Sequence, residues 1–208
     1  EKRELARKLF PRANILESFD ELSDSANLDA ISIASYDNYH FDQIIKAIDR
    51  NLNVFIEKPI CQTKLELNLI YSLYKKNNIV MRSNFPLRTT PRFVDLKSDL
   101  RNKVFGNILS LNLNYFWGRK EKFLYGWRRE IDNYSIIQGG MIHMLDLAYF
   151  LLEEWPIEVM GAMSNKGFKE YEDSEKRSLY DNAIIILKYK DGKIINCRVD
   201  ALSCHPHF

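Results

Sequence analysis

The strongest constraint in this sequence is the alternation of short apolar runs with helical segments over residues 28–84. Three apolar runs of strand length are separated by two segments with apolar residues at helical spacing. In chain order these segments are 28–35, 39–51, 53–58, 64–78 and 79–84. This order is typical of βαβ crossovers in a parallel sheet. The runs alternate poorly between apolar and polar residues, as in a sheet covered on both faces. We therefore predict that residues 1–84 form part of a doubly wound, Rossmann-type α/β domain.

The pattern changes after Asn84. Residues 89–102 predict a helix, and residues 108–116 alternate cleanly between apolar and polar side chains, as in a sheet with unlike faces. Two later apolar runs flank Asp191-Gly192, a strong hairpin signal. We predict a second α/β domain over residues 85–208, with one or two helices and an open, mostly antiparallel sheet.

The composition excludes several classes of function. The chain has 208 residues, a formal charge of +2 and 28% charged residues, which is too balanced for nucleic acid or an anionic membrane. No stretch approaches the roughly 20 apolar residues that span a bilayer. The three cysteines form no CxxC and the N-terminus has no signal-peptide core, so we expect a cytoplasmic protein. Cys204, His205 and His207 lie close together, but no matching cluster completes a metal site, and we predict none.

The second apolar run ends abruptly at Glu57-Lys58-Pro59. Ligands of doubly wound sheets bind beyond the carboxyl ends of the strands. Pro59 biases Lys58 away from helical geometry, so its ammonium has a fixed origin. There it can hydrogen-bond a substrate hydroxyl or stabilise developing charge. The alternative is that the two charges only solvate a strand end.

A second candidate lies in a helix that follows Gly139-Gly140. The predicted core stripe of this helix is Ile142, Leu145, Tyr149 and Leu152. His143 and Asp146 share another face and are close enough in sequence to touch. A carboxylate beside an imidazole fixes its tautomer, and histidine titrates near neutrality, so the pair suits acid/base work. The alternative is a core histidine with Asp146 bonded elsewhere.

Together these motifs resemble the Gfo/Idh/MocA family, the glucose–fructose oxidoreductase and inositol dehydrogenase type of NAD(P)-dependent enzymes. The resemblance is carried by "DAISIASYDNYHFDQIIKAIDRNLNVFIEKP", "SNFPLRTTPRFVDLKSDL", "VFGNILSLNLNYFWG", "GGMIHMLDLAYFL" and "DNAIIILKYKDGKI". It implies a Rossmann domain followed by an α/β domain, with the nicotinamide between them. It also implies NAD or NADP as cofactor, and hydride transfer at a hydroxyl-bearing carbon of a sugar, polyol or sugar nucleotide. Homo-oligomers, dimers or tetramers, are implied as well.

The resemblance assigns roles to particular residues. Lys58 would lie beside nicotinamide and substrate, His143 would be the acid/base, and Asp146 would help to orient it. Positions that match cofactor-lining residues are Ser35, Asn38, His40, Glu57, Lys58, Pro59 and Arg88. Trp127 would join Lys58 and His143 in the substrate pocket. We expect Lys58 and His143 to face one shared cleft.

Two features depart from the family pattern. Gly139 stands where many members have an aspartate, four residues before the catalytic histidine, and no GxGxxG loop occurs. We expect this sequence to be a piece of a longer protein that lacks about one βαβ unit in front and part of the sheet behind. Such a piece would bind NAD(P) poorly. Two other accounts stay open: a non-catalytic relative that acts as a ligand-binding or scaffold module, and an unrelated α/β protein that assembles through an exposed sheet.

Overall fold

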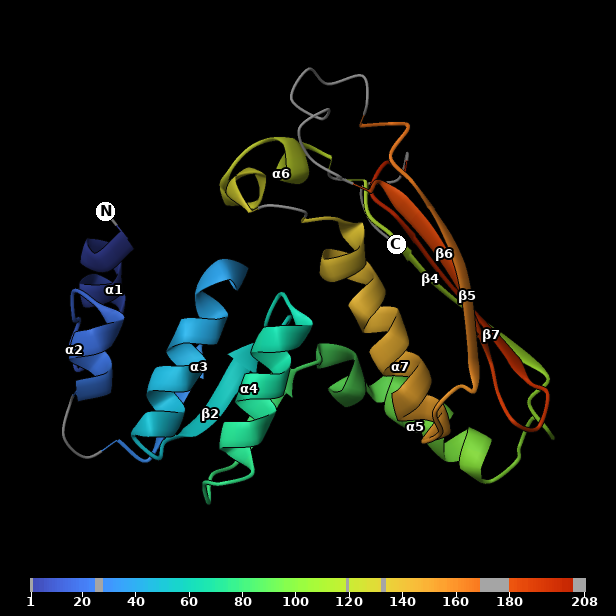
Figure 1. Cartoon of the computed structure of the whole chain (residues 1–208), viewed down its shortest axis with the longest axis horizontal. Helices are drawn as coiled ribbons and strands as arrows, with labels where there is room; N and C mark the ends of the chain where they lie inside the picture. The colour runs from blue at the N-terminus through green and yellow to red at the C-terminus, as the bar shows by residue number, and fades with distance from the viewer. Residues whose placement is uncertain (1, 25–27, 119, 132–133, 169–179, 204–208) are drawn as a thin grey trace. The chain divides into compact units, whose positions relative to one another are not determined.

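The structure is a computed structural model that describes residues 2–24, 28–118, 120–131, 134–168 and 180–203. The chain divides into two compact units, Glu1–Asn84 and Phe85–Phe208 (Figure 1). None of the helices in the described ranges combines the length and apolar character that crossing a bilayer requires.

The first unit is built on a three-stranded parallel sheet in the order β1-β2-β3. Its elements are α1 (Lys2–Leu9), α2 (Phe19–Asp24), β1 (Ala30–Ile33), η1 (Asp37–Tyr39), α3 (His40–Asp49), β2 (Asn53–Glu57), α4 (Lys64–Tyr74) and β3 (Met81–Asn84). In the register, Ile33 lies opposite Ile56, and Glu57 lies opposite Asn84. The carboxyl ends of the strands therefore meet at one edge of the sheet. This arrangement confirms the predicted partial Rossmann-type parallel sheet.

One face of this sheet is buried beneath α3 and α4. Ile33 and Ile56 on the strands pack in one apolar cluster with Ile44 of α3 and Ile70 of α4. Fully burying such a side chain contributes about 1.5–3 kcal/mol. The opposite face carries Phe55, which is exposed in the described part of the chain. In the residues that the structure describes, helices cover one face of the sheet, and the predicted cover of the other face is not seen at Phe55.

A capping box fixes where α4 begins. The Thr63 side chain accepts a hydrogen bond from the Glu66 backbone N–H at 3.2 Å, and the Glu66 carboxylate accepts one from the Thr63 N–H at 2.9 Å. Two N–H groups that no helical carbonyl can reach are satisfied in this way. The loop that carries Lys58 and Pro59 therefore ends at a defined point.

The second unit is built on a four-stranded sheet in the order β4-β7-β6-β5. Its elements are η2 (Pro86–Thr89), α5 (Pro91–Arg101), β4 (Ser110–Phe116), α6 (Glu121–Leu124), η3 (Trp127–Glu130), the π-helical turn η4 (Ile137–Met141), α7 (Ile142–Leu152), β5 (Glu158–Ser164), β6 (Asn182–Lys188) and β7 (Ile194–Asp200). β4 runs parallel to β7, whereas the β7–β6 and β6–β5 pairs are antiparallel. The predicted open, mostly antiparallel sheet is confirmed. Gly192, at φ +89°, supplies the turn between β6 and β7.

Helix α7 lies along one face of this sheet (Figure 1). Its buried side chains are Met144, Leu147, Ala148 and Leu151, and they pack in one core with the inward side chains of β7. The predicted core stripe is therefore wrong: Leu145, one of its members, is 37% exposed. The helix is apolar on nearly every side and follows a π-helical turn, so ideal helical spacing cannot identify its buried face.

Candidate active site

In the first unit, polar side chains lie at the carboxyl edge of the parallel sheet. Glu57 is the last residue of β2, and Asn84 is the last residue of β3. The Asn84 amide donates a hydrogen bond to the Glu57 carboxylate at 2.6 Å. The carboxylate directly before Lys58 is therefore held by the neighbouring strand. Sequence reasoning missed Asn84, although its place at the end of an apolar run was a usable signal.

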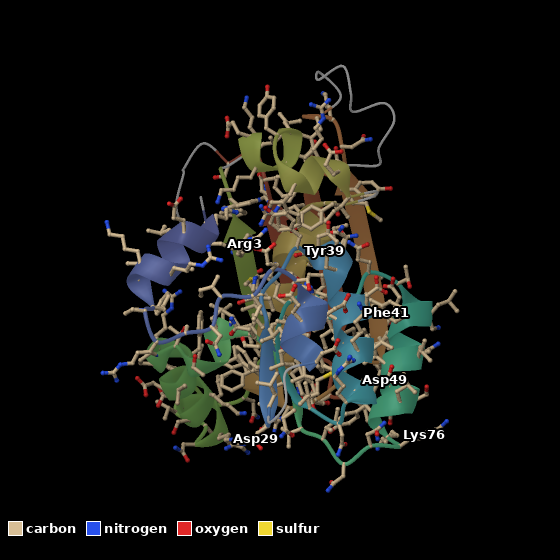
Figure 2. All side chains as sticks on the ribbon, turned by 90° about the vertical axis from the view of Figure 1, so that its left-hand side faces the viewer. Arg3, Asp29, Tyr39, Phe41, Asp49 and Lys76 are labelled. Carbon is tan, nitrogen blue, oxygen red and sulfur yellow. The ribbon has the colours of Figure 1, made fainter. Side chains whose placement is uncertain are left out.

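His40, predicted to line the cofactor, is buried within the first unit. Its side chain is 0% exposed. Nδ1 lies 2.7 Å from the carbonyl oxygen of Pro59, and Nε2 lies 3.2 Å from that of Ser35. His40 is the first residue of α3, and its ring lies beside the residues that follow β1 and β2. Figure 2 labels Tyr39 at this end of α3 and Asp29, just before β1, at the opposite end of the unit.

The other predicted residues of this unit differ in accessibility. Asn38 is exposed in η1, whereas Ser35, Glu57 and Lys58 are half-buried. The Ser35 hydroxyl donates to the Gln43 side chain at 2.7 Å. Pro59 is buried and follows a cis peptide bond. Their roles as cofactor ligands stay predictions.

In the second unit, two aromatic rings flank His143 near the start of α7. The Tyr115 ring of β4 stacks on the imidazole, with centroids 5.8 Å apart and planes at 20°. Phe85 meets it edge-on at 6.2 Å and 85°. These contacts restrict the rotation of the imidazole. The inward phase of β4 could have predicted that Tyr115 faces the helix, but not which side chain it meets.

His143 also lines a cavity of about 560 Å³. The lining residues are Pro86, Leu87, Arg92, Phe93, Asn112, Leu113, Asn114, Tyr115, His143, Met144 and Leu147. The volume falls within the range of roughly 300–1,000 Å³ typical of small-molecule sites. A second hollow, of about 360 Å³, has Gly118 and Leu202 in its wall and includes none of the predicted site residues.

Asp146 and Arg88 are partners of each other. The Asp146 side chain is 9% exposed and accepts three hydrogen bonds from the Arg88 guanidinium, at 2.6, 2.9 and 3.1 Å. These bonds raise the pKa of Arg88 above its ordinary value. The sequence predicted Asp146 beside His143 and Arg88 at the cofactor, but it could not show a pair 58 residues apart. The pair joins η2 to the face of α7 that carries His143.

The glycine at the expected aspartate position has a structural explanation. A Cβ atom at Gly139 would lie 3.0 Å from the hydroxyl oxygen of buried Tyr134. The Tyr134 ring also packs edge-on against Trp127 at 5.8 Å, and Arg128 lies 4.2 Å from the Trp127 ring centroid. Trp127 thus belongs to an aromatic cluster beneath the glycine pair, and its part in substrate binding stays a prediction.

The described ranges contain no group of three or more His, Cys, Asp or Glu side chains that could hold a metal ion. Cys204, His205 and His207 lie outside the described residues. The expectation that Lys58 and His143 face one cleft also stays a prediction, because they belong to different units.

The first unit is a parallel βαβ sheet with polar strand ends, the architecture of dinucleotide-binding α/β domains. The second is an open sheet whose helix presents a histidine to a ligand-sized cavity. The chain belongs to the Gfo/Idh/MocA family. Residues 2–85 match the domain described as "Oxidoreductase family, NAD-binding Rossmann fold", and residues 93–207 match the "GFO/IDH/MocA C-terminal domain".

Named relatives agree with this membership. Levoglucosan dehydrogenase of Pseudarthrobacter phenanthrenivorans is 26% identical over 154 residues, which are 72% of this chain and 40% of the relative. Myo-inositol 2-dehydrogenase of Thermotoga maritima is 23% identical over 179 residues, 84% of this chain and 50% of the relative. The crystal structure of myo-inositol 2-dehydrogenase from Lactobacillus plantarum shares the fold, with a TM-score of 0.83 at 23% identity over 95% of this chain and 59% of that one. The chain spans about half the length of the curated relatives it matches.

Proposed function

We propose that the protein is an NAD(P)-dependent oxidoreductase that transfers hydride between the nicotinamide and a hydroxyl-bearing carbon of a sugar or polyol. One observation carries the proposal. The chain holds an ammonium, Lys58, at the carboxyl edge of its NAD-binding-type sheet, and an imidazole, His143, in the wall of a ligand-sized cavity. Relatives named for levoglucosan and myo-inositol support a carbohydrate or polyol as substrate.

The residues present fit one half of the cofactor. Asn38, Ser35, Glu57 and Lys58 are accessible or half-buried donors and acceptors at the strand ends, suited to ribose hydroxyls and the nicotinamide amide. The sequence contains no GxGxxG loop, the usual cradle for the diphosphate. When bound, NAD(P) supplies the hydride chemistry at its nicotinamide ring.

The protein's own groups supply placement and proton handling. The Lys58 ammonium hydrogen-bonds the reacting hydroxyl and stabilises negative charge that develops on its oxygen. The His143 imidazole takes the hydroxyl proton, and Tyr115 and Phe85 hold the ring in one orientation. Asp146 accepts hydrogen bonds from Arg88 and so fixes the helix face that carries His143.

The alternative of a non-catalytic, ligand-binding relative is favoured by a specific observation, the glycine at position 139. Without the usual aspartate, proton transfer would rest on His143 and Lys58 alone. A module of this kind would bind NAD(P) or a sugar but show no turnover with either cofactor.

The test is a fluorescence titration of NADH and NADPH into the full-length protein, followed by a panel of polyols and sugars. We expect His143→Gln and Lys58→Met each to lower kcat/KM about 10²–10⁴-fold, the usual contribution of a positioned acid/base or charge-stabilising group. His143→Gln should leave NAD(P) affinity nearly unchanged. Turnover that survives both substitutions together would overturn the proposed site, and binding without turnover would favour the ligand-binding module.

We also propose a cytoplasmic location. Cys61 and Cys197 are free thiols in the described residues, which agrees with a reducing compartment.

A further inference from the structure

A single imidazole joins the turns that follow β1 and β2. Ser35 lies two residues beyond β1, and Pro59 lies two residues beyond β2. The fully buried His40 ring stands between them, with Nδ1 at 2.7 Å from the Pro59 oxygen and Nε2 at 3.2 Å from the Ser35 oxygen. The Pro59 contact spans 19 residues of sequence and links neighbouring parallel strands at their carboxyl edge.

Only one of the two contacts of His40 can be a hydrogen bond when the ring is neutral. Both oxygens belong to backbone carbonyls, which can only accept hydrogen bonds, whereas a neutral imidazole has one N–H to donate. The shorter distance assigns that hydrogen to Nδ1, so that His40 donates to Pro59.

The Pro59 carbonyl is one residue away from the Lys58 Cα atom. Because each residue has only two soft backbone dihedrals, holding this carbonyl restricts where the Lys58 side chain begins. On the other side of Lys58, the Glu57 carboxylate is held by Asn84 at 2.6 Å. Lys58 therefore lies between two anchored neighbours, one tied to α3 and the other to β3.

We propose that His40 is a positioning residue for Lys58, which acts through its hydrogen bond to the Pro59 carbonyl and does not touch the cofactor. The inference deepens the proposed function, since the consequence for turnover rests on Lys58 being a catalytic group. The restraint on Lys58 itself is independent of any substrate.

Three substitutions separate the two ring contacts. His40→Asn places an amide N–H near the position of Nδ1 and keeps a donor for Pro59. His40→Gln places its amide nearer the position of Nε2, and His40→Leu removes both donors. Ile44→Ala is the matched control, because Ile44 lies fully buried in the same helix and its truncation destabilises α3 without touching the hydrogen bond.

The first measurement needs no turnover. Trace acetylation of the full-length protein with acetic anhydride, followed by mass spectrometry, reports the reactivity of Lys58 relative to the exposed Lys64. We expect His40→Leu and His40→Gln to change this ratio by more than the spread among replicate wild-type samples. His40→Asn and Ile44→Ala should match wild type. An unchanged ratio in His40→Leu, or an equal change in Ile44→Ala, would overturn the inference.

The second measurement is steady-state kinetics. We expect His40→Leu to lower kcat about tenfold to a hundredfold, the effect of misplacing a catalytic group by about 1 Å, with little change in the KM for NAD(P). His40→Asn should restore most of kcat. If wild type turns over no substrate but the acetylation ratio of Lys58 still changes with the His40 substitutions, the proposed function fails and the positioning role stands.

A measurement on wild type covers the case in which the variants do not fold. Long-range ¹H–¹⁵N spectra distinguish a protonated from an unprotonated ring nitrogen. A protonated Nδ1 on His40 is expected, and a neutral ring with its hydrogen on Nε2 would overturn the assignment.

Discussion

At the scale of single residues, the glycine pair ahead of α7 determines how the His143 ring is packed. A Cβ atom at Gly140 would lie 2.8 Å from Cδ1 of Tyr115 and 3.1 Å from Cδ1 of Ile136. Tyr115 is the ring that stacks on His143, so the absence of a side chain at position 140 allows this stack to form. Gly139 differs, because its nearest neighbour is the hydroxyl oxygen of Tyr134 at 3.0 Å.

Gly140→Ala should therefore disturb both stability and activity. The added methyl group must push the Tyr115 ring, and overpacking of this kind costs about 1–3 kcal/mol. We expect urea denaturation to show a loss of this size, and kcat to fall because the imidazole loses its support. Gly139→Ala is the matched control: its tight contact is with a single hydroxyl group, so it should cost less. Equal effects of the two substitutions on kcat would contradict the assigned role of Tyr115.

At the scale of elements, Glu153 joins the end of α7 to α5. It ends the helix in the left-handed region, at φ 55°. Its carboxylate accepts hydrogen bonds from Lys97 at 2.8 Å and from Arg101 at 2.5 and 3.2 Å. These bonds lower the pKa of Glu153 from 4.5 to about 2, and the hydrogen bond from Lys97 has the largest effect. The ionised carboxylate thus stabilises the contact between two helices that border the His143 cavity.

The sign of the pH dependence follows from the lowered pKa. The stabilising contribution of Glu153 is complete above pH 4.5 and is lost as the pH falls from 4.5 to about 2. We expect Glu153→Gln to be less stable than wild type at pH 7 and equally stable near pH 2, in urea titrations at a series of pH values. The difference should be small and should shrink in 1 M NaCl, because the group is exposed. A difference that grows toward low pH would contradict this account.

The elements also show what sequence alone could establish. The parallel sheet and the mostly antiparallel sheet were predictable because strand length, helical spacing and turn residues are local signals. The buried face of α7 was not, because Leu145 and Met144 are equally apolar and only packing distinguishes them. The contacts of His40 could not be predicted, because its partners are backbone carbonyls, which leave no trace in a sequence pattern. The Arg88–Asp146 pair required the fold to bring distant segments together.

At the scale of the whole molecule, the sheet of the second unit has an open face. α7 covers one side, and none of the described helices of this unit lies over the strands on the other (Figure 1). Exposed apolar side chains on this face include Met160 of β5, Ile194 of β7 and Ile184 of β6, which is 41% exposed. The same face carries Arg198 opposite Ile184 and Lys188 opposite Ile194. Exposed apolar side chains bordered by polar groups are typical of association surfaces. We expect two copies of the protein to pair through it.

Ile184→Glu tests this pairing with little risk to the fold. Ile184 lies opposite Arg198 on the neighbouring strand, so a glutamate at this position gains a cross-strand ion pair in the isolated subunit. In an interface between two copies, the introduced carboxylate would lose its water to apolar side chains of the partner. This loss should weaken association about a hundredfold or more. Light scattering after size-exclusion chromatography, over a range of concentrations, measures the shift to monomer. Leu65→Glu, at a site 82% exposed on α4, is the control and should assemble like wild type. An Ile184→Glu protein that stays as associated as the control would show that assembly uses another surface.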